Sequence, residues 1–148
     1  MKLLIILFLS INLYAQDTLY FFPQDAKKAK QKIEKLINNS KYSIDIAMYN
    51  FEDKKLAKLL DKAQKRGVSV KIFYDKKDVD FKNIDAKTLK KKLHTKIAIF
   101  DKKIVVFGSP NWTKKSFRDN YEVLYITDAK KLLTEFNKFF STLQSIKK

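Results

Sequence analysis

The sequence predicts an α/β sandwich, in which a mixed β-sheet is flanked by helices on both faces. Short segments with the periodicity of strands alternate with longer segments of helical periodicity along most of the chain. Such alternation is typical of domains that pack helices against a sheet. Two of the predicted strands near residue 100 are joined by only three residues, so they must pair antiparallel and make the sheet mixed.

The first helix is expected between two strands. Strands are predicted at Thr18–Phe22 and Ser43–Tyr49, where apolar residues cluster or alternate with polar ones. Asp25 is a suitable N-cap for the helix, which should end near Asn38–Asn39. The apolar positions of this helix recur with the helical period: Ala26, Ala29, Ile33, Leu36 and Ile37.

A second helix is expected to begin at Asp53, a suitable N-cap, and to stop at Gly67. Its apolar stripe consists of Leu56, Leu59, Leu60 and Ala63. A strand at Val68–Tyr74 follows. Residues 75–93 are rich in Asp and Lys, and we expect a loop there followed by a short helix from about Asp85.

The remaining elements are three strands and a long helix. Strands are predicted at Thr95–Phe100 and Ile104–Phe107, joined by a tight turn at residues 101–103. A further strand at Glu122–Ile126 leads to the last helix, for which Asp128 is a suitable cap. The apolar face of that helix consists of Leu132, Leu133, Phe136, Phe139, Phe140 and Leu143.

The chain of 148 residues suits one domain, which we place at residues 16–148. Residues 1–15 have the layout of a signal peptide, with Lys2 near the start, the apolar run Leu3–Leu13 and the small Ala15 before the cleavage point. The apolar run is shorter than the roughly 20 residues that span a bilayer. We therefore expect a periplasmic or secreted protein, with an uncleaved membrane anchor and a buried first strand as alternatives.

The strong positive charge points to polyanionic partners. The chain carries 32 basic and 16 acidic residues, and all basic residues except Arg66 and Arg118 are lysines. Residues 1–15 contain one lysine and no acid, so 31 basic and 16 acidic residues, a net charge of +15, would remain after cleavage. Nucleic acid and anionic membrane surfaces are the candidate partners. Lysine acts as a point charge on phosphate, so binding should show little sequence specificity.

The sequence contains no cysteine. Disulfides, thiol catalysis and cysteine-ligated zinc are therefore excluded. There is one histidine, His94, and no evident cluster of carboxylates for a pair of metal ions. We expect no metal and no cofactor.

Several residues that suit a phosphate ligand follow His94 at short spacing. His94 and Lys96 are two apart on a predicted strand, so both side chains should leave the same face. Gly108 permits a tight turn and the close approach of a ligand to the backbone. Ser109, followed by proline, is predicted to cap a helix, where free N–H groups, its hydroxyl and the Asn111 amide would form an anion cradle.

This stretch, HTKIAIFDKKIVVFGSPN, resembles the HKD signature of the phospholipase D superfamily. All six fixed positions of the signature are present at the required spacing: His94, Lys96, Asp101, Gly108, Ser109 and Asn111. Asn120 and Glu122 resemble the downstream Asn-x-Glu element of the short bacterial nucleases in this superfamily. The resemblance implies a phospholipase D-like sandwich fold and a site that cleaves phosphodiesters without a metal ion.

The resemblance also implies roles for single residues. One histidine attacks phosphorus to form a phosphohistidine, while a second histidine protonates the leaving oxygen. Because this chain has only His94, the site should be shared by a two-fold homodimer. Lys96 and Asn111 would stabilise the phosphoryl group, with Ser109 contributing to phosphate binding. Glu122 is expected to orient the His94 ring.

For two other positions of the signature, Asp101 and Gly108, we expect structural roles. We expect Asp101 to stabilise the turn rather than to take part in chemistry, and Gly108 to act through the backbone.

The preferred interpretation is an endonuclease that hydrolyses DNA, and RNA as a further substrate. Four aromatic residues are candidates for stacking on the bases of a single strand: Tyr49, Phe51, Trp112 and Phe117. A phospholipase that acts on anionic lipids, with peripheral membrane association, is the first alternative. A nucleic-acid-binding or DNA-uptake protein with a vestigial motif is the second.

Overall fold

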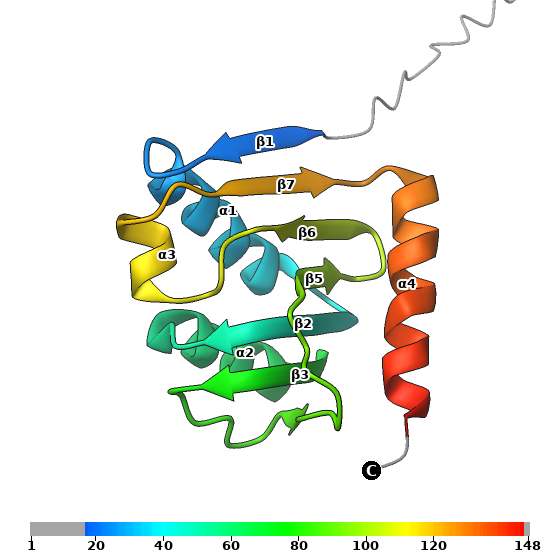
Figure 1. Cartoon of the computed structure of the whole chain (residues 1–148). Helices are drawn as coiled ribbons and strands as arrows, with labels where there is room; N and C mark the ends of the chain where they lie inside the picture. The colour runs from blue at the N-terminus through cyan, green and yellow to red at the C-terminus, as the bar shows by residue number, and fades with distance from the viewer. Residues whose placement is uncertain (1–16, 147–148) are drawn as a thin grey trace, which may run out of the picture.

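The computed structural model describes residues 17–146 and contains a seven-stranded sheet in the order β1-β7-β6-β5-β2-β3-β4 (Figure 1). The strands are β1 Thr18–Phe21, β2 Ser43–Phe51, β3 Ser69–Lys77, β4 Asp85–Lys87, β5 Lys96–Phe100, β6 Ile104–Gly108 and β7 Val123–Thr127. β2 pairs parallel to β3, and β3 to β4, whereas all other pairs are antiparallel. The sheet is therefore mixed, as predicted. The expected signal peptide lies outside the described residues.

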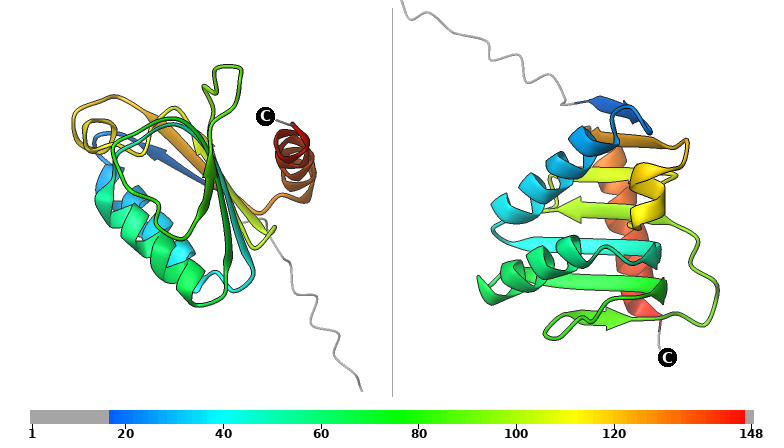
Figure 2. Two further views of the ribbon diagram at one scale, coloured as in Figure 1. Left: turned by 90° about the horizontal axis from the view of Figure 1, so that it is seen from below. Right: turned by 90° about the vertical axis from the view of Figure 1, so that its left-hand side faces the viewer.

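Helices cover both faces of this sheet, which confirms the predicted sandwich. The helices are α1 Ala26–Asn39, α2 Lys54–Lys65, α3 Lys114–Arg118 and α4 Lys130–Ser145. Viewed along the sheet, α1 and α2 lie on one face and α4 on the other (Figure 2). The short α3 lies between β6 and β7 in the chain, at one end of the sheet (Figure 1), and begins a few residues later than the helix predicted to follow Ser109.

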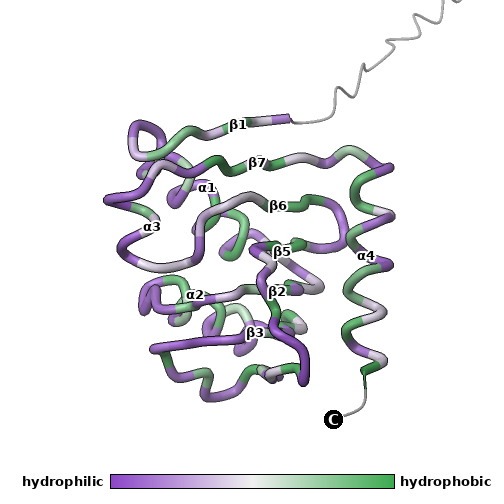
Figure 3. Tube along the Cα trace, in the orientation of Figure 1, coloured by the Kyte–Doolittle hydropathy of each residue, from purple (hydrophilic) through white to green (hydrophobic). Residues whose placement is uncertain are grey.

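Two apolar clusters fill the spaces between these layers. The larger one joins the predicted stripes of α1 and α2 to one face of the strands, with Ile33, Leu56 and Ile46 fully buried. The smaller one joins α4 to the opposite face through residues such as Phe140 and Phe73. The hydropathy of the chain follows this arrangement, with apolar segments along the central strands and alternating segments along α4 (Figure 3).

The predicted helix caps have different outcomes. The Asp53 carboxylate accepts hydrogen bonds from the N–H groups of Lys55 and Leu56, both at 3.0 Å, so it caps α2 as predicted. Gly67 ends α2 with a φ of 90°, a conformation that favours glycine.

Asp25 precedes α1 but makes no capping hydrogen bond with its side chain, because its carboxylate accepts the N–H of Phe21 at the preceding turn instead. The prediction for Asp128 is also wrong. The N-cap position of α4 is Ala129, whose N–H donates to the Thr127 hydroxyl oxygen at 3.0 Å.

The predicted short helix from Asp85 is replaced by a strand. β4 pairs parallel with β3, placing Ala86 beside Ile72. The exposed backbone edge of β3 needs hydrogen-bond partners, and β4 supplies them. Ile84, at 9% exposure, anchors this strand in the core. The charged composition of this segment did not reveal the pairing, since edge strands often carry lysine.

The turn between β5 and β6 is a tight hairpin turn with two left-handed residues. Asp101 and Lys102 have φ values of 51° and 56°, and the N–H of Lys103 donates to the Phe100 carbonyl at 2.9 Å. Lys102 also forms an ion pair with the buried Asp45. These contacts fix the antiparallel β5–β6 pair that was predicted.

Asp101 ties this turn to the beginning of β2. Its carboxylate accepts hydrogen bonds from the N–H groups of Lys41, Tyr42 and Ser43 at 2.7–3.1 Å. Burial alone would raise the pKa of Asp101, but these backbone donors outweigh burial and lower the pKa. The structural role expected for Asp101 agrees with these contacts.

We expect Asp101→Asn to lose about 1 kcal/mol of the free energy of unfolding at neutral pH, because a charged acceptor is removed from a partly exposed site. A carboxyl group whose pKa is lowered in the folded state stabilises the fold above its unfolded pKa, and this effect disappears as the pH falls through the folded value. The difference from the wild type should therefore shrink below about pH 4. Urea unfolding between pH 7 and pH 3 measures it.

Asn tolerates positive φ, so this substitution leaves the turn conformation accessible. Asp80→Asn, at an exposed aspartate, is the matched control and should change the free energy of unfolding much less. A difference for Asp101→Asn that stays constant over the pH range would contradict the role given to the carboxylate.

Candidate active site

The pairing register aligns the ends of four neighbouring strands. Lys96, at the start of β5, pairs with Met48 of β2, and the β5–β6 register places it level with Gly108. Gly108 in turn pairs with Leu124 of β7. The segments that carry the predicted site residues therefore leave the sheet at the same end, where α3 lies (Figure 1). Asp101 is the exception, because β5 separates it from Lys96 by about 16 Å.

His94 lies just before β5, on a segment that is held by its neighbours. The N–H of Leu93 donates to the Asp75 carboxylate at 3.0 Å, and the Leu93 side chain is buried in the core. The carbonyl of Thr95 accepts the N–H of Tyr49 at 2.8 Å. The imidazole itself is exposed and packs against the Tyr49 ring, with centroids 4.6 Å apart. His94 is thus a solvent-accessible side chain on a fixed backbone.

Lys96 reaches back to His94, as the predicted spacing required. Its Nζ lies 3.4 Å from Nδ1 and 3.5 Å from Nε2 of His94, and it donates to the His94 carbonyl at 2.9 Å. Partial burial lowers the pKa of the Lys96 ammonium. The negative charge of Glu122 opposes this shift, whereas the positive charge of Lys92 adds to it.

Asn111 lies on the segment that joins β6 to α3 and is positioned by β2. Its Oδ1 accepts the N–H of Asn50 at 3.2 Å, and this contact directs the oxygen of the amide to the backbone. The Nδ2 group makes no hydrogen bond within residues 17–146, so two N–H donors are available to a ligand. This geometry suits the predicted role in binding phosphate.

Ser109 does not cap a helix, contrary to the prediction. α3 begins four residues after Pro110, at Lys114, and its N-cap is Thr113, whose hydroxyl oxygen accepts the N–H of Ser116 at 3.1 Å. An anion cradle at a helix N-terminus following Ser109 is therefore absent from this part of the described chain. The reason is that Ser109 pairs with the start of β7 instead.

The hydroxyl of Ser109 donates to the Glu122 carboxylate and accepts the N–H of Val123 at 3.0 Å. The other oxygen of Glu122 accepts from Nδ2 of Asn120 at 2.9 Å. Within one described chain, Glu122 makes no hydrogen bond with the His94 ring, contrary to expectation. Glu122 instead fixes Ser109 and adds negative charge near Lys96.

Gly108 allows β6 and β7 to approach closely. A Cβ atom at this position would lie 2.1 Å from the carbonyl oxygen of Val123 and 3.0 Å from the α-carbon of Leu124. A close approach to the backbone of Gly108 was predicted and is present. The approaching group is the neighbouring strand β7, whereas the sequence suggested a ligand.

Most of the aromatic residues proposed for base stacking are buried. Trp112 and Phe51 are 1% and 0% exposed and pack on each other, with ring centroids 5.3 Å apart. Phe117 belongs to α3, and its ring packs on the buried Phe22. Tyr49 alone among the four contacts His94, so the stacking prediction is wrong for Trp112 and Phe51 and is limited to Tyr49 near the site.

Sequence reasoning missed two features beside the site. The first is a group of lysines around Tyr49, formed by Lys76, Lys92 and Lys96. Lys96 was predicted as a site residue, but nothing in the sequence distinguished Lys76 and Lys92, which are 16 residues apart, from the other lysines.

The second missed feature is an exposed apolar surface along β1 and β7, which we call the β1–β7 surface. It is formed by Leu19, Phe21, Tyr121 and Val123, exposed by 53%, 53%, 89% and 42%. The pairing of Phe21 with Val123 places these side chains on one face. Small hollows connect this surface to Ser109 and Glu122. Alternation along the predicted first strand could have revealed part of it.

Residues 17–146 contain no group of three or more His, Asp or Glu side chains placed to hold a metal ion. In the same range, none of the helices is long and apolar enough to cross a membrane.

Comparison with solved structures identifies close similarities. NucT from Helicobacter pylori is 27% identical, with a TM-score of 0.79, and the match covers 89% of this chain and 98% of that one. Nuc from Salmonella typhimurium, described as a phospholipase D family member, is 24% identical with a TM-score of 0.73, covering 87% of this chain and 93% of that one. The latter likeness supports the fold.

Curated proteins and a family model also match this chain. The chain is 23% identical to the mitochondrial cardiolipin hydrolase of Homo sapiens over 82% of its own residues, and it spans only 54% of that protein. The family described as "Cardiolipin synthase, PLD-like domain" matches residues 33–144, most of the chain. The match to this family model over most of its length shows that the chain belongs to the phospholipase D-like family.

Proposed function

We propose that this protein is an endonuclease that hydrolyses phosphodiester bonds of DNA, and also of RNA, with little sequence preference. The observation that carries this proposal is the convergence of an exposed imidazole, an ammonium and a free amide on one end of the sheet. Histidine can attack phosphorus, while Lys96 and Asn111 can stabilise charge on the phosphoryl oxygens. The net charge of +16 would draw a polyanion to this site.

The proposed reaction has two steps. A nitrogen of His94 attacks phosphorus, and the bond from phosphorus to the leaving oxygen breaks as a second imidazole gives that oxygen its proton. Water then attacks the phosphohistidine, passes a proton to the second imidazole, and releases His94 with the phosphate product. Each proton is returned within the cycle, so the sequence of steps needs no metal ion.

The second imidazole must come from another copy, since His94 is the only histidine of the chain. We propose a two-fold dimer in which the β1–β7 surface forms part of the contact. This surface adjoins Ser109 and Glu122, so covering it with a second chain would bring that chain to the edge of the site. Four exposed apolar side chains on one sheet face are unusual on a surface so rich in lysine.

Two alternative activities have specific support. The similarity to mitochondrial cardiolipin hydrolase favours an anionic phospholipid as substrate. The density of lysines favours a protein that binds nucleic acid without cleaving it. We prefer cleavage to binding alone because His94 and Lys96 are in contact and accessible, and the choice between nucleic acid and lipid is made by the assays below. Export directed by residues 1–15 would let the enzyme meet nucleic acid outside the cytoplasm.

The purified protein should cleave a fluorescently labelled single-stranded DNA in excess EDTA, and His94→Ala should reduce the rate by at least about a thousandfold because the nucleophile is removed. His94 is exposed, so the variant should unfold at nearly the wild-type temperature. Gel analysis of the products measures the cleavage.

Duplex DNA, RNA and vesicles of anionic phospholipid are assayed in parallel. Strict dependence on Mg²⁺ would contradict the proposed steps. Turnover of lipid alone would select the phospholipase, and binding of DNA without cleavage would select the binding protein.

Replacing Leu19 and Phe21 with serine should convert the dimer to monomers and abolish cleavage, because the apolar contact between copies is removed. Sedimentation velocity gives the mass of the species, and the DNA assay gives their activity. Both side chains are more than half exposed, so the fold should be retained.

Tyr42→Ser is the matched control, since Tyr42 is 68% exposed but lies at the opposite end of β2 from the site. It should leave mass and activity unchanged. A fully active monomer with Leu19→Ser and Phe21→Ser would refute the shared site.

A further inference from the structure

We propose that Lys76 and Lys92, gathered around the ring of Tyr49, form a second phosphate-binding subsite beside the reaction centre. This subsite would hold the phosphate next to the one that is cleaved in a nucleic acid strand. The inference rests on the proposed function and deepens it, because it names the part of the substrate that the enzyme recognises besides the scissile bond.

Three ammonium groups share one aromatic ring. The Nζ atoms of Lys76, Lys92 and Lys96 lie 5.6, 5.3 and 5.2 Å from the centroid of Tyr49. The imidazole of His94 contacts the same ring. Attraction of cations to the ring offsets part of the repulsion between them, but only by about 0.5–1 kcal/mol for each exposed pair. A patch of positive charge therefore borders the candidate nucleophile directly.

The acids near this patch leave its lysine side chains without ion pairs in the described part of the chain. Within residues 17–146, none of the three lysines forms an ion pair with Asp or Glu. Glu122 influences Lys96, and the Asp75 carboxylate binds the backbone N–H of Leu93. The excess positive charge beyond Lys96 is thus carried by Lys76 and Lys92, which a bound anion would stabilise.

The backbones that carry these lysines are fixed. Lys76 lies in β3 and pairs with Asn50, the neighbour of Tyr49 in β2. Lys92 precedes Leu93, which is anchored by its buried side chain and its hydrogen bond to Asp75. Only the exposed side chains must be ordered when a ligand binds, which limits the entropic cost.

A linear polymer of phosphodiesters matches this arrangement. Lys96 and Asn111 would hold the scissile phosphate, and Lys76 and Lys92 would meet a neighbouring phosphate beside the Tyr49 ring. Lysine carries charge without base-reading geometry, so the contact would be insensitive to sequence. A compound with a single phosphodiester would leave the subsite empty.

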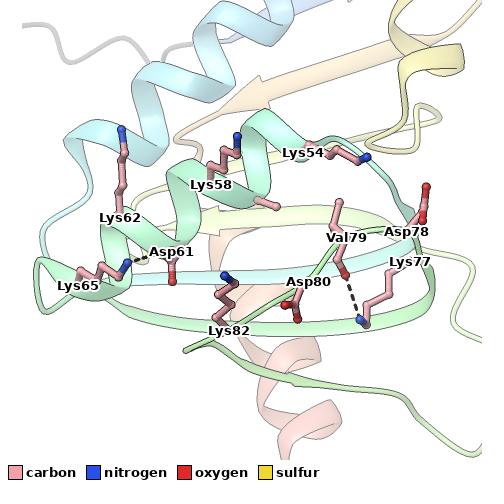
Figure 4. Close-up of a pocket in the computed structure, with 11 residues that line it drawn as sticks. Lys54, Lys58, Asp61, Lys62, Lys65, Lys77, Asp78, Val79, Asp80 and Lys82 are labelled. Atoms are coloured by element: carbon pink, nitrogen blue, oxygen red, sulfur yellow. Dashed lines mark hydrogen bonds and ion pairs between the residues drawn. The ribbon is translucent and has the colours of Figure 1, made fainter.

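A second lysine-rich region offers a control of the same charge. A groove of about 830 Å³ between α2 and the segment after β3 is lined by Lys54, Lys58, Lys62, Lys65, Lys77 and Lys82 (Figure 4). Asp61, Asp78 and Asp80 also line it, and Asp61 is paired with Lys65. Lys58 and Lys62 belong to α2 and make no contact with His94 or Tyr49, so removing them changes the net charge without altering the proposed subsite.

The test compares Lys76→Gln combined with Lys92→Gln against Lys58→Gln combined with Lys62→Gln. The substrates are a ten-residue oligothymidylate and bis(p-nitrophenyl) phosphate, which contains one phosphodiester. For the first pair, kcat/KM on the oligonucleotide should fall about tenfold, as expected for lost bonds to a charged group. Its turnover of the small substrate should change less than about twofold.

Salt dependence gives an independent readout. Loss of one phosphate contact should reduce the slope of log affinity against log salt by about 0.7 for a single strand. Binding to an uncleavable phosphorothioate oligothymidylate measures this slope for the Lys76 and Lys92 pair, and the control pair should keep the wild-type slope.

Equal losses on both substrates, or equal effects of the two pairs, would overturn the subsite. The wild type separates this result from failure of the proposed function, because an enzyme without phosphodiesterase activity would cleave neither substrate.

Discussion

At the end of β6, the backbone of Gly108 lies against β7 so closely that a side chain has no room, with 2.1 Å between an added Cβ and the Val123 carbonyl oxygen. This close approach lets the Ser109 N–H donate to the same carbonyl at 3.0 Å and lets the Ser109 hydroxyl meet Val123 and Glu122. The acid near Lys96 is fixed as a result. The positions of Ser109 and Glu122 at the site therefore depend on a close contact between the backbones of two strands.

The electrostatic arrangement follows from that framework. Lys76, near the end of β3, and Lys92, in the loop anchored by Leu93, bring positive charge to the Tyr49 ring. Glu122 supplies the main negative charge near Lys96. Partial burial of Lys96 lowers its pKa and strengthens its interaction with a bound anion. The site is thus prepared for negative charge before substrate arrives, which is the condition for electrostatic stabilisation of a phosphoryl group.

Much of the fold, and the pairing of His94 with Lys96, could be predicted because these features depend on short-range sequence patterns. The helical stripes, the Asp53 cap and the spacing of His94 and Lys96 depend on residues close in sequence. β4 was missed because its formation depends on the open edge of β3, a long-range constraint. Ser109 was placed wrongly for a similar reason, since its hydroxyl is engaged by β7, fourteen residues away.

The aromatic residues illustrate the same limit. Trp112 and Phe51 looked like stacking surfaces because they flank polar site residues, but the close bridge between their backbones places both in the core. The lysine cluster could not be predicted either, since Lys76 and Lys92 meet only through the pairing of β2 with β3 and the anchoring of Leu93. Composition indicated the class of partner, and tertiary structure was needed to locate its contacts.

The central claim is that two copies of His94 serve one phosphate. The most direct measurement mixes wild-type protein with a ninefold excess of His94→Ala, allows the subunits to exchange, and follows DNA cleavage per wild-type chain. Random pairing leaves about one tenth of the wild-type chains with a wild-type partner, so the activity per wild-type chain should fall to about that fraction. Unchanged activity per wild-type chain after demonstrated exchange would contradict the shared site.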